Sequence, residues 1–389
     1  MIGDPRPVLV VDDSELNRDM LSRRLERRGF HVVLAAGGAE ALEIVERTPL
    51  EAVLLDVMMP GMDGWQVLSR VRAVHPLADL PVIMITAKDR SEDIVHALEL
   101  GANDYVTKPL DFPVVVARLQ TQITLKRAKR DLEVAHARMK KDLDAAAKLQ
   151  QALIPQSLPA IDGARFAWRF RPCTELAGDI FDIVRIDDGT VGVYLVDVCG
   201  HGVPAALLSV TLSRVLSHMA DRYSPLQAAE SGGPRPPADV AAWLNRRFPM
   251  DVATSQYFTF FYGTCDVASR RFRYVTAGHP APIHAPVQGN PVCLPAGGFA
   301  IGWFPDCAVE ETAISLAPGD RLFFYSDGLV EAKNDHQELF DAPRLLDAIT
   351  RTRTAPIDSS LQTILDDVLR WCGDEPPDDD ISLVGIEFC

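Results

Sequence analysis

The sequence predicts two globular domains joined by a long helix: a doubly wound, flavodoxin-like α/β domain first, and an α+β domain with mainly antiparallel sheets second. Short apolar runs alternate with amphipathic segments from residue 7 to about residue 119, and neither Gly nor Pro occurs between about 121 and 153. From about residue 166, many β-rich segments follow, separated by Gly, Pro and Asn. The 389 residues are also too many for one ordinary core, because single cores stop growing at about 250–300 residues.

The five apolar runs of the first domain are VLVVDD, HVVLAA, AVLLDV, PVIMITA and DYVTKP, each followed by a helical pattern. This βαβ rhythm is typical of a parallel sheet covered on both faces by helices. The carboxyl ends of such strands converge on one crevice. Asp12 and Asp13 end the first run, Asp56 the third, Thr86 the fourth and Lys108 the fifth. We therefore expect three carboxylates, a hydroxyl and an ammonium group to meet there.

This set of groups favours phosphoryl transfer. Three close carboxylates repel one another unless a hard cation lies among them, and Mg²⁺ prefers such oxygen ligands together with phosphate oxygens. Asp56 can then attack a phosphoryl group and form an acyl phosphate, while Mg²⁺ and Lys108 balance the charge. The alternative is that each Asp only caps a helix or satisfies a loop. Suitable residues at the successive strand ends argue against that alternative.

These strand ends, with LLDVMMPGMDG around Asp56 and GANDYVTKP around Lys108, resemble the response-regulator receiver (CheY-like) family over residues 7–123. The resemblance implies that a sensor histidine kinase or phosphotransfer protein phosphorylates Asp56. It also implies that Thr86 turns toward the phosphate and that Tyr105 changes rotamer with it. The implied Mg²⁺ ligands are the carboxylates of Asp12, Asp13 and Asp56 and the backbone carbonyl of Met58.

The segment after this domain is predicted to be a long helix that Pro155 ends. Apolar residues recur there every seven positions, which gives the helix coiled-coil potential. Asp142 interrupts the seam, which is short and rich in alanine, so a solvated spacer helix is the alternative. Homodimerisation through the 121–153 helix is therefore a hypothesis. We set the domain boundaries at 1–123 for the receiver, 124–155 for the helical linker and 156–389 for the last domain. The recurring residues are Leu125, Leu132, Met139, Ala146 and Leu153.

The last domain carries four separated acidic motifs, each at the edge of an apolar β-like run. Rigid backbone at such an edge can aim a carboxylate at a shared point. Taken alone, a DG pair is usually a turn and a DDD run is usually a solvated loop. The motifs are Asp179 with Asp182, Asp197, Asp327, and the run Asp378, Asp379 and Asp380.

Together with AKLQQALIP, CGHGVPAALLS, TAGHPAP, SDGLVEA and DDISLV, these motifs resemble the PPM (protein phosphatase 2C-like) family and its SpoIIE-like branch over residues 145–389. The resemblance implies a four-layer αββα sandwich that binds two Mn²⁺ or Mg²⁺ ions. Asp197 would bridge both ions, and Asp327 and Asp379 would bind one of them. The backbone carbonyl of Val198 would help to hold the other ion, and Asp179 would act through a coordinated water.

A water that bridges two such ions is acidified, and the resulting hydroxide can attack a phosphoserine or phosphothreonine in line. His201, between Gly200 and Gly202, is a candidate proton donor to the leaving alkoxide, although loop histidines without a role are commoner. For His279 we expect a packing or loop-shaping role. Ala177 stands where the family pattern commonly has a Gly, and this change removes no ligand.

The composition indicates which classes of binding partner and which cellular compartment to expect. The formal net charge of -15 argues against non-specific binding to nucleic acid or membranes, which needs a basic surface. Seven cysteines without a CxxC pair are a poor disulfide framework, which favours a reducing cytoplasm. We expect no DNA partner, no signal peptide and no membrane span, since no run of about 18 apolar residues occurs.

These parts predict a two-component response regulator in which phosphorylation of Asp56 changes the activity of a serine/threonine phosphatase. By analogy with the SpoIIE-like branch, the substrate would be a phosphorylated STAS-type anti-sigma factor antagonist in partner switching. One alternative is a catalytically silent binding module gated by the receiver, against which the intact Asp residues argue. Another is a phosphatase that acts on a small molecule or on another phosphoprotein. The sign of the regulation is not visible in the sequence, and we favour activation.

Overall fold

A computed structural model describes residues 6–86, 91–155, 158, 160–217, 225–227, 233–250, 256–304 and 309–389, without the side chains of residues 91–94. The chain divides into two compact units, Met1–Lys140 and Lys141–Cys389. In the first unit, five parallel strands lie in the order β2-β1-β3-β4-β5. The strands are β1 (Val8–Val11), β2 (Val32–Ala35), β3 (Ala52–Asp56), β4 (Val82–Thr86) and β5 (Asp104–Thr107).

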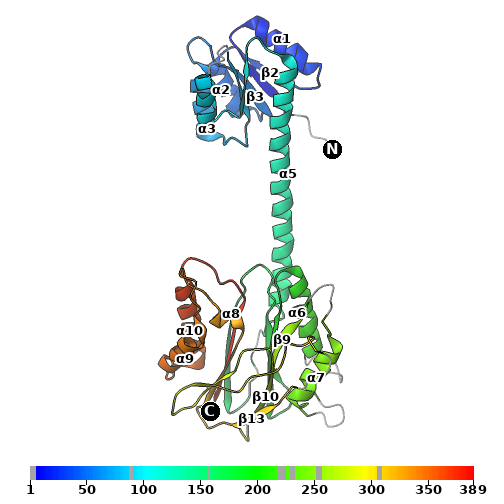
Figure 1. Cartoon of the computed structure of the whole chain (residues 1–389), viewed down its shortest axis with the longest axis vertical. Coiled ribbons are helices and arrows are strands. Elements are labelled where there is room, and N and C mark those ends of the chain that lie inside the picture. Colours follow the sequence, from blue (N-terminus) through cyan, green and yellow to red (C-terminus); the bar gives the residue numbers. More distant parts are fainter. Residues whose placement is uncertain are drawn as a thin grey trace. The chain divides into compact units, whose positions relative to one another are not determined.

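Helices cover both faces of this sheet, as Figure 1 shows. Alternate residues of the buried strands point to opposite faces, so Leu9 and Leu55 pack with α2 and α3, while Val10 and Leu54 pack with α1 and α5. The predicted doubly wound, flavodoxin-like fold is confirmed. The helices are α1 (Glu15–Glu26), α2 (Gly38–Arg47), α3 (Gly64–Val74), α4 (Ser91–Glu99) and α5 (Phe112–Gln151).

The predicted long helix is part of α5, which has 40 residues. It begins inside the receiver unit, so the last receiver helix and the linker are one continuous element. The cause is local: after Pro113, which a first helical turn tolerates, neither Gly nor Pro occurs before Pro155. Leu125, Leu132 and Met139 of the predicted seam are exposed. Coiled-coil pairing of this helix stays a prediction.

The second unit contains two five-stranded sheets, β13-β10-β9-β8-β7 and β12-β11-β14-β15-β6, whose paired strands are antiparallel. The strands of the first sheet are β7 (Ile180–Arg185), β8 (Thr190–Val198), β9 (Phe258–Asp266), β10 (Arg271–Ala277) and β13 (Thr312–Ser315). Those of the second are β6 (Ala164–Arg171), β11 (Ile283–Ala285), β12 (Val292–Cys293), β14 (Arg321–Tyr325) and β15 (Ile381–Phe388).

Three cores hold these layers together. Between the sheets, Phe261 and Phe272 contact Phe324 at ring-centroid distances of 4.6 and 5.8 Å. The outer face of the first sheet packs on α6 (Val203–Leu216) and α7 (Pro237–Arg247), and that of the second packs on α9 (Asp341–Arg351) and α10 (Ile357–Cys372). Figure 1 shows these helices on opposite sides of the unit, which confirms the predicted αββα sandwich. None of the described helices combines the length and hydrophobicity of a membrane span.

Candidate active sites

The acidic crevice predicted for the first unit forms at the carboxyl ends of β1 and β3. Asp12, Asp13 and Asp56 each bring a carboxylate oxygen to within 4.8 Å of the other two. Asp12 and Asp56 are buried, and among the described residues Asp56 Oδ1 has no hydrogen-bond partner. A buried carboxylate oxygen without a donor is costly unless something binds it. The donor set therefore fits a hard cation such as Mg²⁺.

Lys108 supplies a positive charge to this crevice. Its Nζ lies 2.8 Å from Asp56 Oδ2 and 3.3 Å from Asp12 Oδ2. Burial raises the pKa of Asp56, and the hydrogen bond from Lys108 opposes that shift. Burial would lower the pKa of Lys108, but the hydrogen bond and the charge of Asp56 raise it. The hydrogen bond between the two groups thus favours the ionised forms of both, which phosphoryl transfer to Asp56 needs.

The other predicted receiver residues lie around this pair. The backbone of Met58 lowers the pKa of Asp56, which indicates that this backbone lies near the crevice. Thr86 is buried at the end of β4. The Arg118 guanidinium carbon lies over the ring of Tyr105 in β5, 5.3 Å from the centroid of that ring. Their roles as metal ligand and switch residues stay predictions.

Sequence reasoning missed two residues that hold the acidic pair of β1. Asn17 Nδ2 lies 3.1 Å from both oxygens of Asp12. Arg18 Nη1 donates to the backbone carbonyls of Asp12 and Asp13 at 2.7 and 3.0 Å. Both residues lie in the first turn of α1, and their position four to six residues after the acidic pair was the available signal.

In the second unit, the predicted ligands come from both sheets. Asp197 lies near the end of β8, in register with Thr259 of β9. Asp327 begins α8 (Asp327–Val330) directly after β14, and Asp379 lies just before β15. Strands β14 and β15 are neighbours, so two of the three carboxylates leave the second sheet side by side.

The electrostatics of these carboxylates show that they face one another. Burial, and then the charges of Asp327 and Asp379, raise the pKa of Asp197 to about 8. Burial, and then the charge of Asp379, raise the pKa of Asp327 to about 6. Divalent cations between such carboxylates would remove this repulsion. The donor set therefore fits hard cations.

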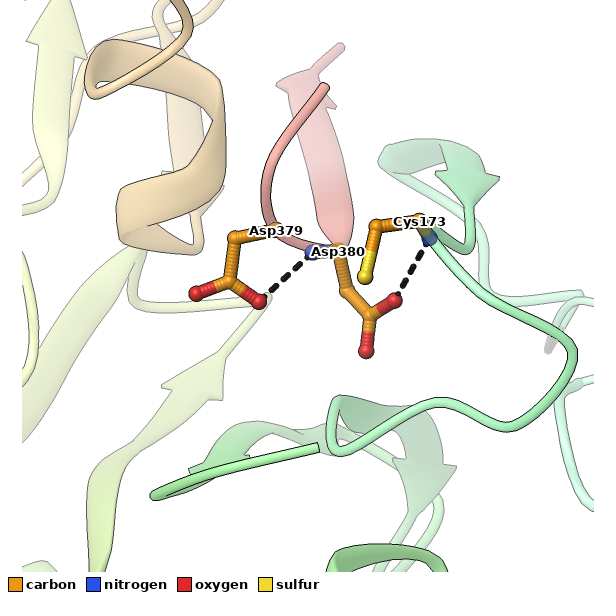
Figure 2. Close-up of side chains that lie close together, drawn as sticks. All are labelled: Cys173, Asp379 and Asp380. Atoms are coloured by element: carbon orange, nitrogen blue, oxygen red, sulfur yellow. Dashed lines mark hydrogen bonds between the residues drawn. The ribbon is translucent and has the colours of Figure 1, made fainter. Parts of the chain in front are cut away.

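The tight clusters of possible ligand atoms do not contain all three carboxylates. The described part of the chain contains two clusters with ligand atoms within 4.8 Å of one another, and neither includes Asp197 or Asp327. Asp379 belongs to the second tight cluster, with Cys173 and Asp380 (Figure 2).

Asp380 was missed as a functional residue, and it organises the loop that carries Asp179. It is buried, and its Oδ1 accepts a hydrogen bond from the backbone of Cys173 at 2.8 Å (Figure 2). Its Oδ2 accepts from the backbone N–H groups of Gly178 and Asp179 at 2.7 and 3.3 Å. Asp379, in contrast, accepts a hydrogen bond from the backbone of Asp380 at 2.7 Å (Figure 2). Asp380 thus fixes the loop that carries Asp179, and the ligand role of Asp379 stays a prediction.

Two serines complete this support. Ser382 Oγ donates to Asp179 Oδ2 at 2.6 Å, and the Ser382 N–H donates to Ser326 Oγ at 2.9 Å. Burial, and then the charges of Asp197 and Asp380, raise the pKa of Asp179 well above its usual range. A Cβ on Gly178 would lie 2.9 Å from the Val198 carbonyl oxygen, so only glycine allows that carbonyl to lie beside Asp179. Both serines stand inside the motifs YSDG and DDIS, which were the available signal.

The two histidines differ. His201 is exposed in the loop between β8 and α6, and its role as proton donor stays a hypothesis. His279 is buried, and its Nδ1 lies 2.7 Å from Thr259 Oγ1. Burial lowers the pKa of His279 to about 3. It is therefore neutral in the core and does not act as a proton donor to substrate.

A thiolate mechanism has no support in this structure. Cys265 and Arg271 have the CxxxxxR spacing of thiolate phosphatases. Both lie in paired strands, however, and Cys265 is buried. Burial raises the pKa of its thiol to about 12, whereas a thiolate nucleophile needs a lowered pKa.

Comparisons with known proteins agree with both halves of this description. The model of the Stage II sporulation protein E (SpoIIE) family matches residues 187–388, and that of the response regulator receiver domain matches residues 8–120. The first match spans more than half of the 389 residues. It begins after Asp179.

Among solved structures, the chain is similar to the SiaA-PP2C domain of Pseudomonas aeruginosa, with 22% identity, a TM-score of 0.55, and coverage of 66% of this chain and 99% of that one. That likeness is one of fold. Similarity also extends to the RsbU and RsbW domains of a Mycobacterium tuberculosis protein (25% identity, 61% and 63% coverage, TM-score 0.49). A CheY-like receiver domain protein from Methanospirillum hungatei matches with 25% identity over 32% of this chain and 99% of that chain, with a TM-score of 0.31.

Proposed function

Because this chain belongs to the Stage II sporulation protein E (SpoIIE) family, and its last unit is a metal-dependent serine/threonine phosphatase, we propose that phosphorylation of Asp56 switches that phosphatase on. The observation that carries the proposal is the presence of two intact acidic sites in one chain. The receiver site has its phosphoacceptor paired with Lys108 at 2.8 Å. The phosphatase site has carboxylates that face one another without a counter-charge among the described lysines and arginines.

In the phosphatase, Asp197, Asp327 and Asp379 would hold two Mn²⁺ or Mg²⁺ ions with the carbonyl of Val198. When bound, the ions supply an acidified water and neutralise the charge of the phosphate. The protein contributes orientation. Ser382 fixes one oxygen of Asp179, and Asp179 would hold an ion through a water. No covalent enzyme intermediate is required, because the attacking oxygen comes from water.

In the receiver, Asp12, Asp13, Asp56 and the Met58 carbonyl would hold one Mg²⁺. Asp56 would accept the phosphoryl group from a sensor histidine kinase or a phosphotransfer protein. Lys108 is positioned to balance the charge of the phosphoryl oxygens. Thr86 and Tyr105 would then respond to the phosphate. The domain boundaries of 1–123, 124–155 and 156–389 remain part of this proposal.

Helix α5 offers a route for the signal, because it begins in the receiver and ends in the phosphatase unit. At that end Gln150 is buried, and its Oε1 accepts the Ala177 N–H at 3.0 Å. Its Nε2 donates to the Ala177 carbonyl at 2.6 Å and to Ser209 Oγ at 2.9 Å. Ala177 lies two residues before Asp179, so a rotation of the helix would move the loop that carries this ligand.

The finer substrate assignment is a phosphorylated STAS-type anti-sigma factor antagonist in partner switching. It is supported by the family alone. A purified phosphorylated STAS-domain protein should be dephosphorylated with a higher kcat/KM than an unrelated phosphoserine peptide. Equal rates for the two would remove this substrate class while leaving the phosphatase proposal intact.

The main test is Mn²⁺-dependent hydrolysis of p-nitrophenyl phosphate and of a phosphoserine peptide by the full chain, with and without acetyl phosphate. Activity should need metal and disappear in Asp197→Asn and Asp327→Asn, since each removes a ligand charge. Acetyl phosphate should raise activity in the wild type but not in Asp56→Asn. If folded wild type with excess Mn²⁺ hydrolyses nothing in either state, the alternative of a binding module gated by the receiver is favoured.

A further inference from the structure

Four aromatic side chains gather at the surface of the phosphatase unit: Tyr257, Phe299, Trp303 and Phe304, here called the aromatic rim. Phe299, Trp303 and Phe304 are 52%, 43% and 50% exposed. The ring centroids of Phe299 and Phe304 lie 4.9 Å apart, and those of Tyr257 and Trp303 lie 5.1 Å apart. Phe299 and Trp303 are also stacked at 6.5 Å. The rings therefore form one continuous apolar surface and are not scattered single residues.

One residue of the aromatic rim, Tyr257, lies beside the end of β8 that carries Asp197. The Tyr257 carbonyl accepts a hydrogen bond from the backbone of Cys199 at 3.0 Å, and Cys199 is two residues from Asp197. From Tyr257 the surface continues through Trp303 to Phe299 and Phe304. A molecule bound at the ions would thus meet the rim with its neighbouring groups.

The loop that presents the rim is held rigidly. Asn245 is buried, its Oδ1 accepts the Gly302 N–H at 2.8 Å, and its Nδ2 donates to the Phe304 carbonyl at 2.7 Å. Ile301 exchanges backbone hydrogen bonds with Phe258 at 2.8 and 3.4 Å. Gly302 has a φ of 99°, and a Cβ there would lie 2.8 Å from the Phe248 carbonyl oxygen. The aromatic side chains are therefore exposed on a fixed backbone, which reduces the ordering cost of binding.

We propose that the aromatic rim binds apolar side chains that flank the phosphoserine or phosphothreonine of a protein substrate. This inference rests on the proposed phosphatase function. A phosphoprotein whose phosphate reaches the ions would place the residues beside that phosphate near the aromatic rim, because Tyr257 contacts Cys199, two residues from Asp197. The rim offers no formal charge, and Trp and Tyr at such positions carry much of the energy of protein interfaces. The rim therefore selects apolar flanking residues over charged or small polar ones.

The test uses two phosphoserine peptides that are identical except for the flanking residues, which are Leu and Phe in one and Ser and Gly in the other. With Mn²⁺, the wild-type full chain should hydrolyse the apolar peptide with a kcat/KM about tenfold higher. Trp303→Ala should lower the ratio of apolar to polar kcat/KM by about fivefold or more. Hydrolysis of p-nitrophenyl phosphate, which has no flanking residues, reports on the ions and the cleft separately.

Val292→Ala is the matched control, because it removes an exposed apolar side chain from β12, an outer strand of the other sheet. It should leave the peptide ratio unchanged. Phe304→Ala and Phe299→Ala repeat the test, so a loss of folding in Trp303→Ala, seen by circular dichroism, does not decide the outcome. If p-nitrophenyl phosphate is hydrolysed but both peptides are cleaved equally, or the rim variants leave the ratio unchanged, the inference is overturned. If no substrate is hydrolysed, the phosphatase proposal itself fails.

A second copy of this chain is the competing occupant of the rim. Light scattering of the wild type and of Trp303→Ala distinguishes self-association through the rim from substrate binding at the rim. A shift from dimer to monomer in Trp303→Ala, with an unchanged peptide ratio, would assign the rim to self-association and overturn the substrate assignment. An unchanged molecular mass in Trp303→Ala, together with a reduced ratio of apolar to polar peptide kcat/KM, supports the substrate assignment.

Discussion

The receiver site and the phosphatase site are both acidic, but they differ in where their balancing charge comes from. In the receiver, Lys108 lies within 3.3 Å of Asp12 and 2.8 Å of Asp56. In the described part of the phosphatase unit, no lysine or arginine pairs with Asp197, whose pKa burial and neighbouring carboxylates raise to about 8. Grouped carboxylates without a counter-charge are costly. The receiver site therefore has part of its balancing charge in the chain itself, whereas the phosphatase site depends on added cations for that charge.

The largest expected effect follows from removing these cations. Chelation should lower kcat/KM for p-nitrophenyl phosphate on the order of 10³-fold or more, because bound ions contribute several kcal/mol to such reactions. In calorimetry of the full chain, excess Mn²⁺ should raise the unfolding temperature of the phosphatase unit more than that of the receiver unit. Asp197→Asn should lose most of that shift. Equal shifts of the unfolding temperature in the two units would contradict the idea that the phosphatase site depends more on cations than the receiver site does.

The next prediction removes the counter-charge from the receiver site, so that this site, like the described part of the phosphatase site, has no balancing lysine. Lys108→Met removes the counter-charge from two buried carboxylates, so the receiver unit should lose about 1–3 kcal/mol of unfolding free energy without metal. Mg²⁺ should then stabilise the variant more than it stabilises the wild type, as urea unfolding with and without Mg²⁺ would show. Arg23→Met, which removes an exposed ion pair with Asp19, is the control and should change stability little. An equal Mg²⁺ effect in Lys108→Met and wild type would contradict the idea.

The sequence predicted the receiver site more completely than the phosphatase site. In the receiver, the βαβ rhythm predicted both the fold and the crevice, because Asp12, Asp56 and Lys108 stand at strand ends and strand ends converge. In the phosphatase, the run 378–380 was read as one motif. Its members have three different surroundings: Asp378 pairs with Lys333 at the surface, Asp379 faces the other ligands, and Asp380 is buried under the loop of Asp179.

Contacts between distant segments explain what the sequence did not reveal. Asp380 binds Gly178, which is 202 residues away in the chain, and no local pattern encodes such a pairing. The same is true of Gln150, which local periodicity treats only as one more polar residue of a long helix. Residues that bind backbone groups across the fold are recognised only when the two segments are seen together.

A third prediction concerns the link between the two sites. Gln150→Leu keeps the size of the side chain but removes the partner of the buried Ala177 N–H, and it leaves the Ala177 carbonyl with the longer 3.5 Å bond from Ser209 Oγ, so stability of the phosphatase unit should fall by about 1–3 kcal/mol. The ratio of activity with acetyl phosphate to activity without it should also fall toward one. Lys148→Leu, at an exposed position two residues earlier in the same helix, is the control. A normal activation ratio in Gln150→Leu would mean that the signal reaches the phosphatase by another contact.

The smallest expected effect concerns a carboxylate of the phosphatase unit that has its own donors. Asp320 accepts the backbone N–H groups of Ala317 and Val287 at 2.9 and 3.0 Å and contacts His284 Nε2 at 2.9 Å. Burial would raise its pKa, but these bonds lower it below the usual 3.8. A lowered pKa in the folded state means that Asp320 stabilises the unit above about pH 4, and that this contribution is lost as the pH falls further.

At pH 7, Asp320→Asn should therefore be about 1–2 kcal/mol less stable than the wild type. The difference should shrink below about pH 4, where the wild-type carboxylate becomes protonated. Urea unfolding of both proteins between neutral and acidic pH, without divalent ions, would measure it. The experiment contrasts Asp320 with Asp197 of the same unit, whose pKa is raised because it is buried and because its neighbours are acids. A difference that grows on acidification would show that the donors around Asp320 do not favour its charged form.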